Sequence, residues 1–194
     1  MDPNSYEDLR EEIEISLNND NISNLFKLYD KIDSSFFLEE NGNCIPYIQL
    51  LFKSNDILAP KFIDIWIKDL YANSHSHHEL DVAVVTSAIH VDNLLIINKM
   101  YDKLDKIVFL ESNYFGQDDQ SNLSRLMDSN NTLAPMLVNT IIKNILCNNE
   151  KNVDILQDKN KMLKEILKSI SDSQDAVRNF GRFMNNFVDK LEYK

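Results

Sequence analysis

The residues best suited to metal chemistry lie in a short stretch at positions 75–81, which reads His-Ser-His-His-Glu-Leu-Asp. Imidazole and carboxylate groups bind transition metals, but a structural zinc site needs a closed set of four ligands and commonly includes cysteine. No cysteine lies near this stretch in the sequence. We therefore expect no metal and no other cofactor, and we interpret the stretch as a solvated loop.

Paired carboxylates occur at Glu39-Glu40 and at Asp118-Asp119. Such pairs perform acid–base catalysis where a pocket separates their two pKa values, but both lie in polar stretches that we expect to connect helices. The two cysteines, at positions 44 and 147, have no histidine beside them, so we expect reduced structural thiols. No phosphate-binding loop, GxSxG or HExxH motif is present. The sequence therefore predicts a protein that is not an enzyme.

The composition argues against several other classes. With 3 glycines and 4 prolines among 194 residues, the chain lacks the turn residues on which barrels and sandwiches depend. A net charge of −11 opposes binding to nucleic acid and to anionic lipid surfaces. No apolar run approaches the roughly 18 residues of a membrane helix. We expect an intracellular protein, cytoplasmic by default with the nucleus left open, whose partner is another protein with a basic or mixed surface.

Two pairs of segments resemble each other along the chain. Residues 20–33 read DNISNLFKLYDKID and residues 92–105 read DNLLIINKMYDKLD, with seven of fourteen positions identical at an offset of 72. Residues 54–69 read SNDILAPKFIDIWIKD and residues 129–144 read SNNTLAPMLVNTIIKN, with seven of sixteen identical at an offset of 75. Asp20, Asp56 and Asp92 are also 36 residues apart. This self-similarity predicts tandem repeats with a period near 36 residues.

Each of the four copies has the apolar spacing of a helix. In the first copy, Leu25, Leu28, Tyr29 and Ile32 follow Asp20, a suitable N-cap residue. A shorter apolar stretch precedes each of these helices, so the pattern predicts a short helix, a brief turn and a longer helix in every copy. The predicted fold class is all-α, with about four helix pairs in a tandem array over residues 1–149.

The stretch at positions 41–46, Asn-Gly-Asn-Cys-Ile-Pro, resembles the Asn-Gly-x-Thr-Pro start of an ankyrin repeat, with Ile45 where threonine usually stands. The short first helix and longer second helix are also similar to an ankyrin unit, and the resemblance covers residues 20–147. The Thr-Pro-Leu-His signature is absent from the third copy, where residues 81–84 read Asp-Val-Ala-Val. The period also exceeds the 33 residues usual for ankyrin, so TPR and HEAT-like pairs remain alternatives.

The resemblance implies a non-enzymatic adaptor or assembly factor. In ankyrin-like arrays, the short helices and the projecting loops form the surface that holds a partner protein. The acids at these positions predict a partner that presents lysine and arginine. Carried onto this sequence, the partner-binding residues are Glu39, Glu40, Asn43, Tyr47, His75, His77, Asp81, Asp118 and Asp119.

A heptad pattern in residues 150–194 predicts amphipathic helices with an apolar seam. Such a seam packs against another helix. Folding back would cap the array, whereas packing against a second copy would give a coiled-coil homodimer, and the sequence leaves both open. A seam that binds other chains would make the protein a structural subunit of a multiprotein complex, which is the alternative to an adaptor. The seam consists of Leu156, Leu163, Ile166, Ile170, Val177, Phe180, Met184, Phe187 and Leu191.

Overall fold

The computed structural model describes residues 3–42, 45–73, 77–111, 120–147 and residue 164. Within these residues the chain forms α-helices and short 3-10 helices and no strand, although an isolated antiparallel bridge joins Glu40 and Pro46. The predicted all-α class is confirmed. The chain divides into two compact units, Met1–Asn93 and Leu94–Lys194, and each is described by itself.

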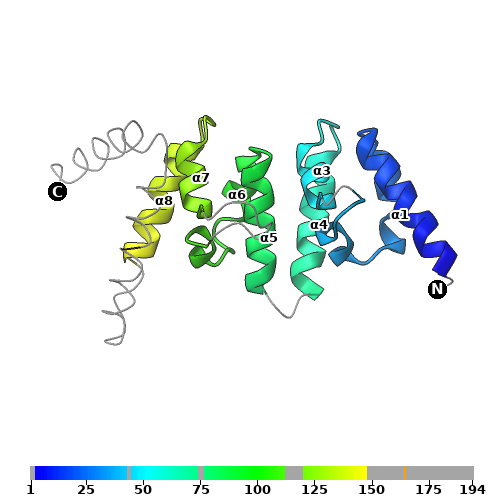
Figure 1. Ribbon diagram of the computed structural model, residues 1–194, viewed down its shortest axis with the longest axis horizontal. Coiled ribbons are helices and arrows are strands. Elements are labelled where there is room, and N and C mark those ends of the chain that lie inside the picture. Colours follow the sequence, from blue (N-terminus) through cyan, green and yellow to red (C-terminus); the bar gives the residue numbers. More distant parts are fainter. Residues whose placement is uncertain (1–2, 43–44, 74–76, 112–119, 148–163, 165–194) are drawn as a thin grey trace. The chain divides into compact units, whose positions relative to one another are not determined.

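The described part of the first unit contains α1 to α5, of which Figure 1 labels α1, α3, α4 and α5. Its central helix is α3, which contacts α1, α4 and α5, and α2 packs against α1 and α4. Two 3-10 helices, Tyr29–Lys31 and Ser34–Leu38, follow α2, and the second of them packs on α3 and α4. The helices are α1 (Pro3–Asn18), α2 (Ile22–Leu28), α3 (Tyr47–Lys53), α4 (Ala59–Asn73) and α5 (His77–His90).

The second unit contains α6 (Leu94–Met100), the 3-10 helix Lys106–Phe109, α7 (Asn122–Asp128) and α8 (Ala134–Cys147). Here α7 packs on α8, and both contact the 3-10 helix. The predicted order of a short helix before a longer one is present in α3/α4 and in α7/α8. It is reversed in α1/α2 and α5/α6, where the longer helix comes first.

The core of the first unit is aromatic. Phe62 on α4 lies at its centre, with ring centroids 5.1 Å from Phe26, 5.2 Å from Tyr29 and 5.7 Å from Phe37. Trp66, one turn further along α4, is fully buried, and its indole N–H donates a 2.7 Å hydrogen bond to the carbonyl of Ser34. The apolar face of α4 therefore fixes α2 and both of the 3-10 helices that follow α2.

The first pair of matching segments adopts the same local structure twice. Asp20 and Asp92 both have left-handed backbones, with φ of 55° and 57°. Each ends a helix in a Schellman motif, in which two successive amides donate to carbonyls of the last helical turn. The four bonds are Asp20 N–Leu17 O (3.1 Å), Asn21 N–Ser16 O (2.8 Å), Asp92 N–Ile89 O (3.1 Å) and Asn93 N–Ala88 O (2.9 Å).

The second pair of matching segments also folds alike. The amide of Leu58 donates to Asp56 Oδ1 at 2.8 Å before α4, and the amide of Leu133 donates to Asn131 Oδ1 at 3.1 Å before α8. The two offsets differ because the chain is longer in one connection. The amide of Tyr47 donates to the Glu39 carbonyl at 3.0 Å, and that of Asn122 to the Glu111 carbonyl at 2.9 Å. The three additional residues therefore lie between Glu111 and Asn122.

A side-chain hydrogen bond recurs across these offsets. The hydroxyl of Tyr29 donates to Asp69 Oδ2 at 2.9 Å in the first unit. In the second unit, the amide group of Asn144 donates to the hydroxyl of Tyr101, also at 2.9 Å. Tyr29 matches Tyr101 at the offset of 72, and Asp69 matches Asn144 at the offset of 75. Tyr29 lies in the 3-10 helix after α2 and Tyr101 in the turn after α6, so the same two matching positions are joined in both units.

The aspartates at 36-residue spacing differ in structure. Asp20 ends α1 instead of starting α2, whose N-cap is Asn21, so the predicted N-cap was wrong by one residue. Asp56 instead accepts hydrogen bonds at helix starts, from the amides of Ile22 at 3.0 Å and Leu58 at 2.8 Å. The hydrogen-bonded local structure thus recurs after two helix pairs rather than after one.

Substitutions at Asp20 test the role of its backbone. Its carboxylate accepts hydrogen bonds from the Ser54 hydroxyl and from the Asn55 amide, and these bonds hold its pKa below the ordinary value. Asp20→Ala and Asp20→Gly both lose these bonds, but only alanine must place a Cβ in the left-handed region. We expect a lower melting temperature for Asp20→Ala than for Asp20→Gly, measured by circular dichroism. Equal melting temperatures would show that the backbone conformation at Asp20 contributes nothing.

Several predicted residues lie outside the described part of the chain. Asn43, His75, Asp118 and Asp119 are among them. So is the whole heptad seam, which comprises Leu156, Leu163, Ile166, Ile170, Val177, Phe180, Met184, Phe187 and Leu191. The boundary at residues 149–150 and the role of the seam stay predictions.

Candidate functional site

The predicted partner-binding residues that the structure describes are divided between surface and interior. Glu39, Glu40 and His77 are exposed, whereas Tyr47 is fully buried and Asp81 is 1% exposed. Tyr47 and Asp81 therefore hold the helices together and present no side chain to solvent. Glu39, Glu40 and Tyr47 come together around one residue that was not predicted, Arg10 of α1.

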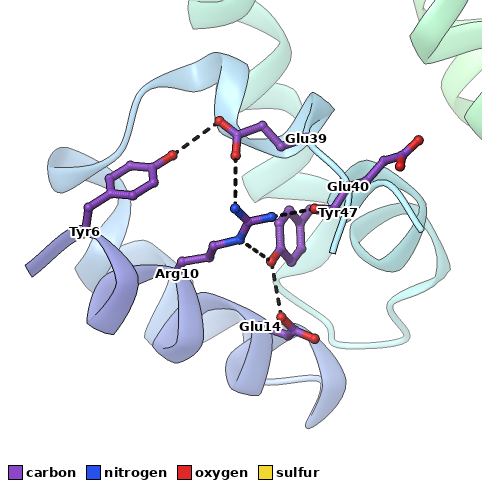
Figure 2. Close-up of polar contacts among 6 residues, drawn as sticks. All are labelled: Tyr6, Arg10, Glu14, Glu39, Glu40 and Tyr47. Carbon is purple, nitrogen blue, oxygen red and sulfur yellow. Dashed lines mark hydrogen bonds and ion pairs between the residues drawn. The ribbon is translucent and has the colours of Figure 1, made fainter. Parts of the chain in front are cut away.

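Arg10 joins α1 to the connection before α3, as Figure 2 shows. Its Nη2 donates to the backbone carbonyl of Glu40 at 2.5 Å, and its Nη1 lies 3.8 Å from Glu39 Oε2. Its Nε donates to the hydroxyl of Tyr47 at 3.1 Å, which raises the pKa of the guanidinium further. Each guanidinium nitrogen therefore has a different partner, so the position of Arg10 is well determined.

Tyr47 is the buried end of this cluster. Its ring stacks on Phe36 with centroids 4.9 Å apart, and its hydroxyl donates to Glu14 Oε2 at 3.2 Å. Burial raises the pKa of the Tyr47 hydroxyl, and the bond from Arg10 opposes that rise. At neutral pH the hydroxyl therefore stays protonated and links Arg10 to Glu14.

Tyr6 completes the cluster at the solvent side. It lies one helical turn before Arg10, and its hydroxyl donates to Glu39 Oε1 at 3.2 Å. Partial burial and the neighbouring Glu39 raise the Tyr6 pKa. Tyr6, Arg10 and Glu14 are spaced by four residues and share one side of α1. That spacing, with a single basic residue among the five acids of α1, is the sequence signal by which the cluster could have been found.

The surface around Arg10 is strongly acidic. We call it the acidic face and define it by Glu7, Glu11, Glu14, Glu39 and Glu40. All are exposed except Glu14, which is half-buried, and Figure 2 shows the Glu40 carboxylate pointing away from Arg10. The face has five carboxylates and one guanidinium, so it keeps a net negative charge that attracts cationic groups.

The histidine-rich stretch joins α4 and α5. The predicted solvated loop is wrong from His77 onward, because α5 begins there. The His77 ring stacks on Tyr71 with centroids 5.6 Å apart, and the Tyr71 hydroxyl donates to the buried carboxylate of Asp81. Burial, followed by the bond to Asp81, raises the Tyr71 pKa far above its ordinary value. These three side chains fasten α5 to α4.

Arg10→Ala should weaken the attachment of α1. The substitution removes two hydrogen bonds from a charged donor and one long ion pair. Because the Arg10 side chain is 38% exposed, we expect a loss of only about 1–2 kcal/mol in the free energy of unfolding. Hydrogen exchange should become faster in α1, with α4 as the internal reference. Unchanged exchange in α1 would mean that Arg10 does not hold the helix.

Comparisons of the chain with protein-family models, with curated proteins and with solved structures find no match. Among the described residues, no group of three or more histidine, cysteine, aspartate or glutamate side chains is arranged to hold a metal ion. In the same part of the chain, no helix has both the length and the apolarity needed to cross a bilayer.

Proposed function

We propose that this protein is a non-enzymatic adaptor or assembly factor that binds a basic surface of another protein. Its scaffold would be a tandem array of helix pairs of the ankyrin-like kind. The observation that carries this proposal is the recurrence, at offsets of 72 and 75 residues, of the same helix end, helix start and tyrosine hydrogen bond. Repeated helix pairs build extended surfaces, and proteins of this architecture use such surfaces to bind partners.

The connection before α3 supports the ankyrin-like assignment. The amide of Asn41 donates to the Ile45 carbonyl at 2.9 Å, and Asn41 Oδ1 accepts from the Ile45 amide at 3.0 Å. Pro46 then precedes α3, which is short, and α4 is longer. The ankyrin resemblance rests on the Asn-Gly stretch, on the proline before the helix and on a short helix followed by a longer one.

The charge of the acidic face supports the choice of partner. Glu7, Glu11 and Glu40 are exposed, and the structure assigns no hydrogen bond or ion pair to their carboxylates. Lysine and arginine side chains of a partner would neutralise these groups, which speeds encounter and selects against acidic proteins. Arg10 would keep Glu39 and the chain around Glu40 in one position, so little ordering would be needed on binding.

Charge reversal on the full chain tests this proposal. The variant Glu7→Lys, Glu11→Lys and Glu40→Lys reverses the exposed charges and leaves Arg10, Glu39 and Tyr47 in place. The control is Asp30→Lys, Glu79→Lys and Asp102→Lys, which changes the net charge equally at exposed positions outside the acidic face. Affinity capture from the native cell, with mass spectrometry, should recover a stoichiometric partner with wild type and with the control. With the first variant, we expect the amount of recovered partner to fall by at least about tenfold.

Two results would contradict the proposal. Equal recovery with both variants would remove the acidic face as the binding site. Failure of wild type to capture any stoichiometric protein would remove the adaptor function itself. Circular dichroism of each variant must first show that it is folded as wild type.

A further inference from the structure

The connection before α3 contains the one asparagine of the chain that a glycine follows, in the pair Asn41-Gly42. An asparagine in this setting can lose its side-chain amide, because the backbone nitrogen of the next residue can attack the side-chain carbonyl carbon. Glycine permits the attack because it has no Cβ to crowd the approach. The other two glycines, Gly116 and Gly181, both follow phenylalanine. Asn41-Gly42 is therefore the place in the sequence best suited to this reaction.

The structure leaves the attacking nitrogen accessible. Gly42 is exposed, and none of the described residues accepts a hydrogen bond from its amide. Apart from its two chain neighbours, no heavy atom lies within 4 Å of the point where a Cβ of residue 42 would be. Solvent bases can therefore reach the N–H of Gly42 and remove its proton, which makes the nitrogen a nucleophile.

The fold also places a hydrogen-bond donor on the oxygen that gains charge in the reaction. The amide of Ile45 donates to Asn41 Oδ1 at 3.0 Å, and the amide of Asn41 donates to the Ile45 carbonyl at 2.9 Å. Because a side-chain NH2 group cannot accept such a bond, Oδ1 must face Ile45. Negative charge develops on Oδ1 when the Gly42 nitrogen attacks, and a fixed N–H donor stabilises that charge. The Ile45 amide therefore favours the attack.

We propose that Asn41 is a site of spontaneous deamidation in the folded protein. The Gly42 nitrogen gives up its proton to a solvent base and forms a bond to Asn41 Cγ, and the Cγ–Nδ2 bond breaks, so that ammonia leaves with a proton from water. Water then opens the resulting succinimide ring at either carbonyl, which gives aspartate or isoaspartate. Both products place a carboxylate directly after Glu40, so the acidic face gains one negative charge. This inference does not depend on the partner-binding proposal.

The two products differ in their effect on the connection before α3. Aspartate keeps an oxygen that accepts from the Ile45 amide. Isoaspartate lengthens the main chain by one carbon atom and attaches the carboxylate to Cα, so it cannot keep both bonds between residues 41 and 45. We therefore expect amide hydrogen exchange in the peptide that contains Ile45 to be at least about threefold faster in the isoaspartate form.

Ageing of the full chain at neutral pH tests the site. Peptide mass spectrometry detects deamidation as a gain of about 1 Da, and chromatography separates aspartate from isoaspartate peptides. The internal reference is Asn55, which is exposed but precedes Asp56. We expect Asn41 to react about tenfold faster than Asn55, and Gly42→Ala to slow the reaction at Asn41 by at least about fivefold. Gly42→Ala should fold as wild type, because the space around Gly42 is open and its φ lies outside the left-handed region.

Three outcomes would overturn the inference. The first is a reaction at Asn41 that is no faster than the reaction at Asn55. The second is an unchanged rate in Gly42→Ala, which would mean that the nitrogen of residue 42 is not the attacking group. The third is deamidation of Asn41 in urea without any in the folded chain, which would show that the fold protects Asn41.

Discussion

Replacing Phe62 with alanine is expected to lower the free energy of unfolding by about 3–5 kcal/mol. The side chain is 1% exposed, and the rings of Phe26, Tyr29 and Phe37 surround it at centroid distances between 5.1 and 5.7 Å. Alanine would leave a cavity that these rigid rings cannot fill, and it would also remove three edge-to-face contacts. Urea unfolding followed by circular dichroism measures the loss.

Two further substitutions show whether the loss comes from the cavity. Phe62→Leu keeps most of the apolar volume and should cost about 1–2 kcal/mol. Lys68→Ala, at an exposed position of the same helix, should change stability by less than about 0.5 kcal/mol. A cost below about 1 kcal/mol for Phe62→Ala would mean that the aromatic cluster does not hold α2 on α4.

Alkaline solution is expected to unfold the protein before two of its tyrosines ionise. Burial, reinforced by hydrogen bonds to Asp69 and Asp81, raises the pKa values of Tyr29 and Tyr71 far above the ordinary value of about 10. The stability that these two tyrosines contribute is complete below pH 10, which is the pKa of tyrosine in the unfolded chain. It is lost as the pH rises towards their raised pKa values in the folded protein. The loss is at most about 2.7 kcal/mol per pH unit for the pair, and less after solvent screening of the half-buried Tyr29.

Absorbance at 295 nm and circular dichroism, recorded together from pH 8 to pH 12.5, measure this behaviour. The ionisation of these two tyrosines should coincide with the loss of helix. In the double variant Tyr29→Phe and Tyr71→Phe, the alkaline transition should move to higher pH. Because the two substitutions also change stability at neutral pH, each protein is compared with its own free energy of unfolding at pH 8. Complete tyrosine ionisation with the helices intact would contradict the assigned hydrogen bonds.

The fold class could be predicted because it depends on local patterns. Apolar residues at helical spacing and the shortage of glycine are properties of the sequence, and both lead to helices. The local structure at the 36-residue spacing was harder to predict, because Asp20, Asp56 and Asp92 look alike in the sequence. Asp20 and Asp92 adopt a left-handed backbone after a helix, whereas Asp56 precedes one. The side chain of aspartate suits both places, so residue type alone could not separate them.

The candidate site could be predicted only in part. Glu39 and Glu40 are exposed because charged residues in a connection stay hydrated, and their role in partner binding stays a prediction. Tyr47 and Asp81 were placed on the surface, but the stacking of Tyr47 on Phe36 and the bond from Tyr71 to Asp81 bury them. Arg10 was missed because its partners are 29 or more positions away in the sequence. Contacts of that kind depend on how helices pack, which a local pattern does not reveal.

The most direct test of the partner-binding account is zero-length carbodiimide cross-linking of the full chain to its captured partner. The reagent couples a carboxylate to an amine only where the two groups are in contact, and mass spectrometry then identifies both residues. The account predicts cross-links from partner lysines to Glu7, Glu11 and Glu40, which are lost at high salt because exposed charges are screened. Cross-links confined to carboxylates elsewhere on the chain, with none on the acidic face, would contradict it.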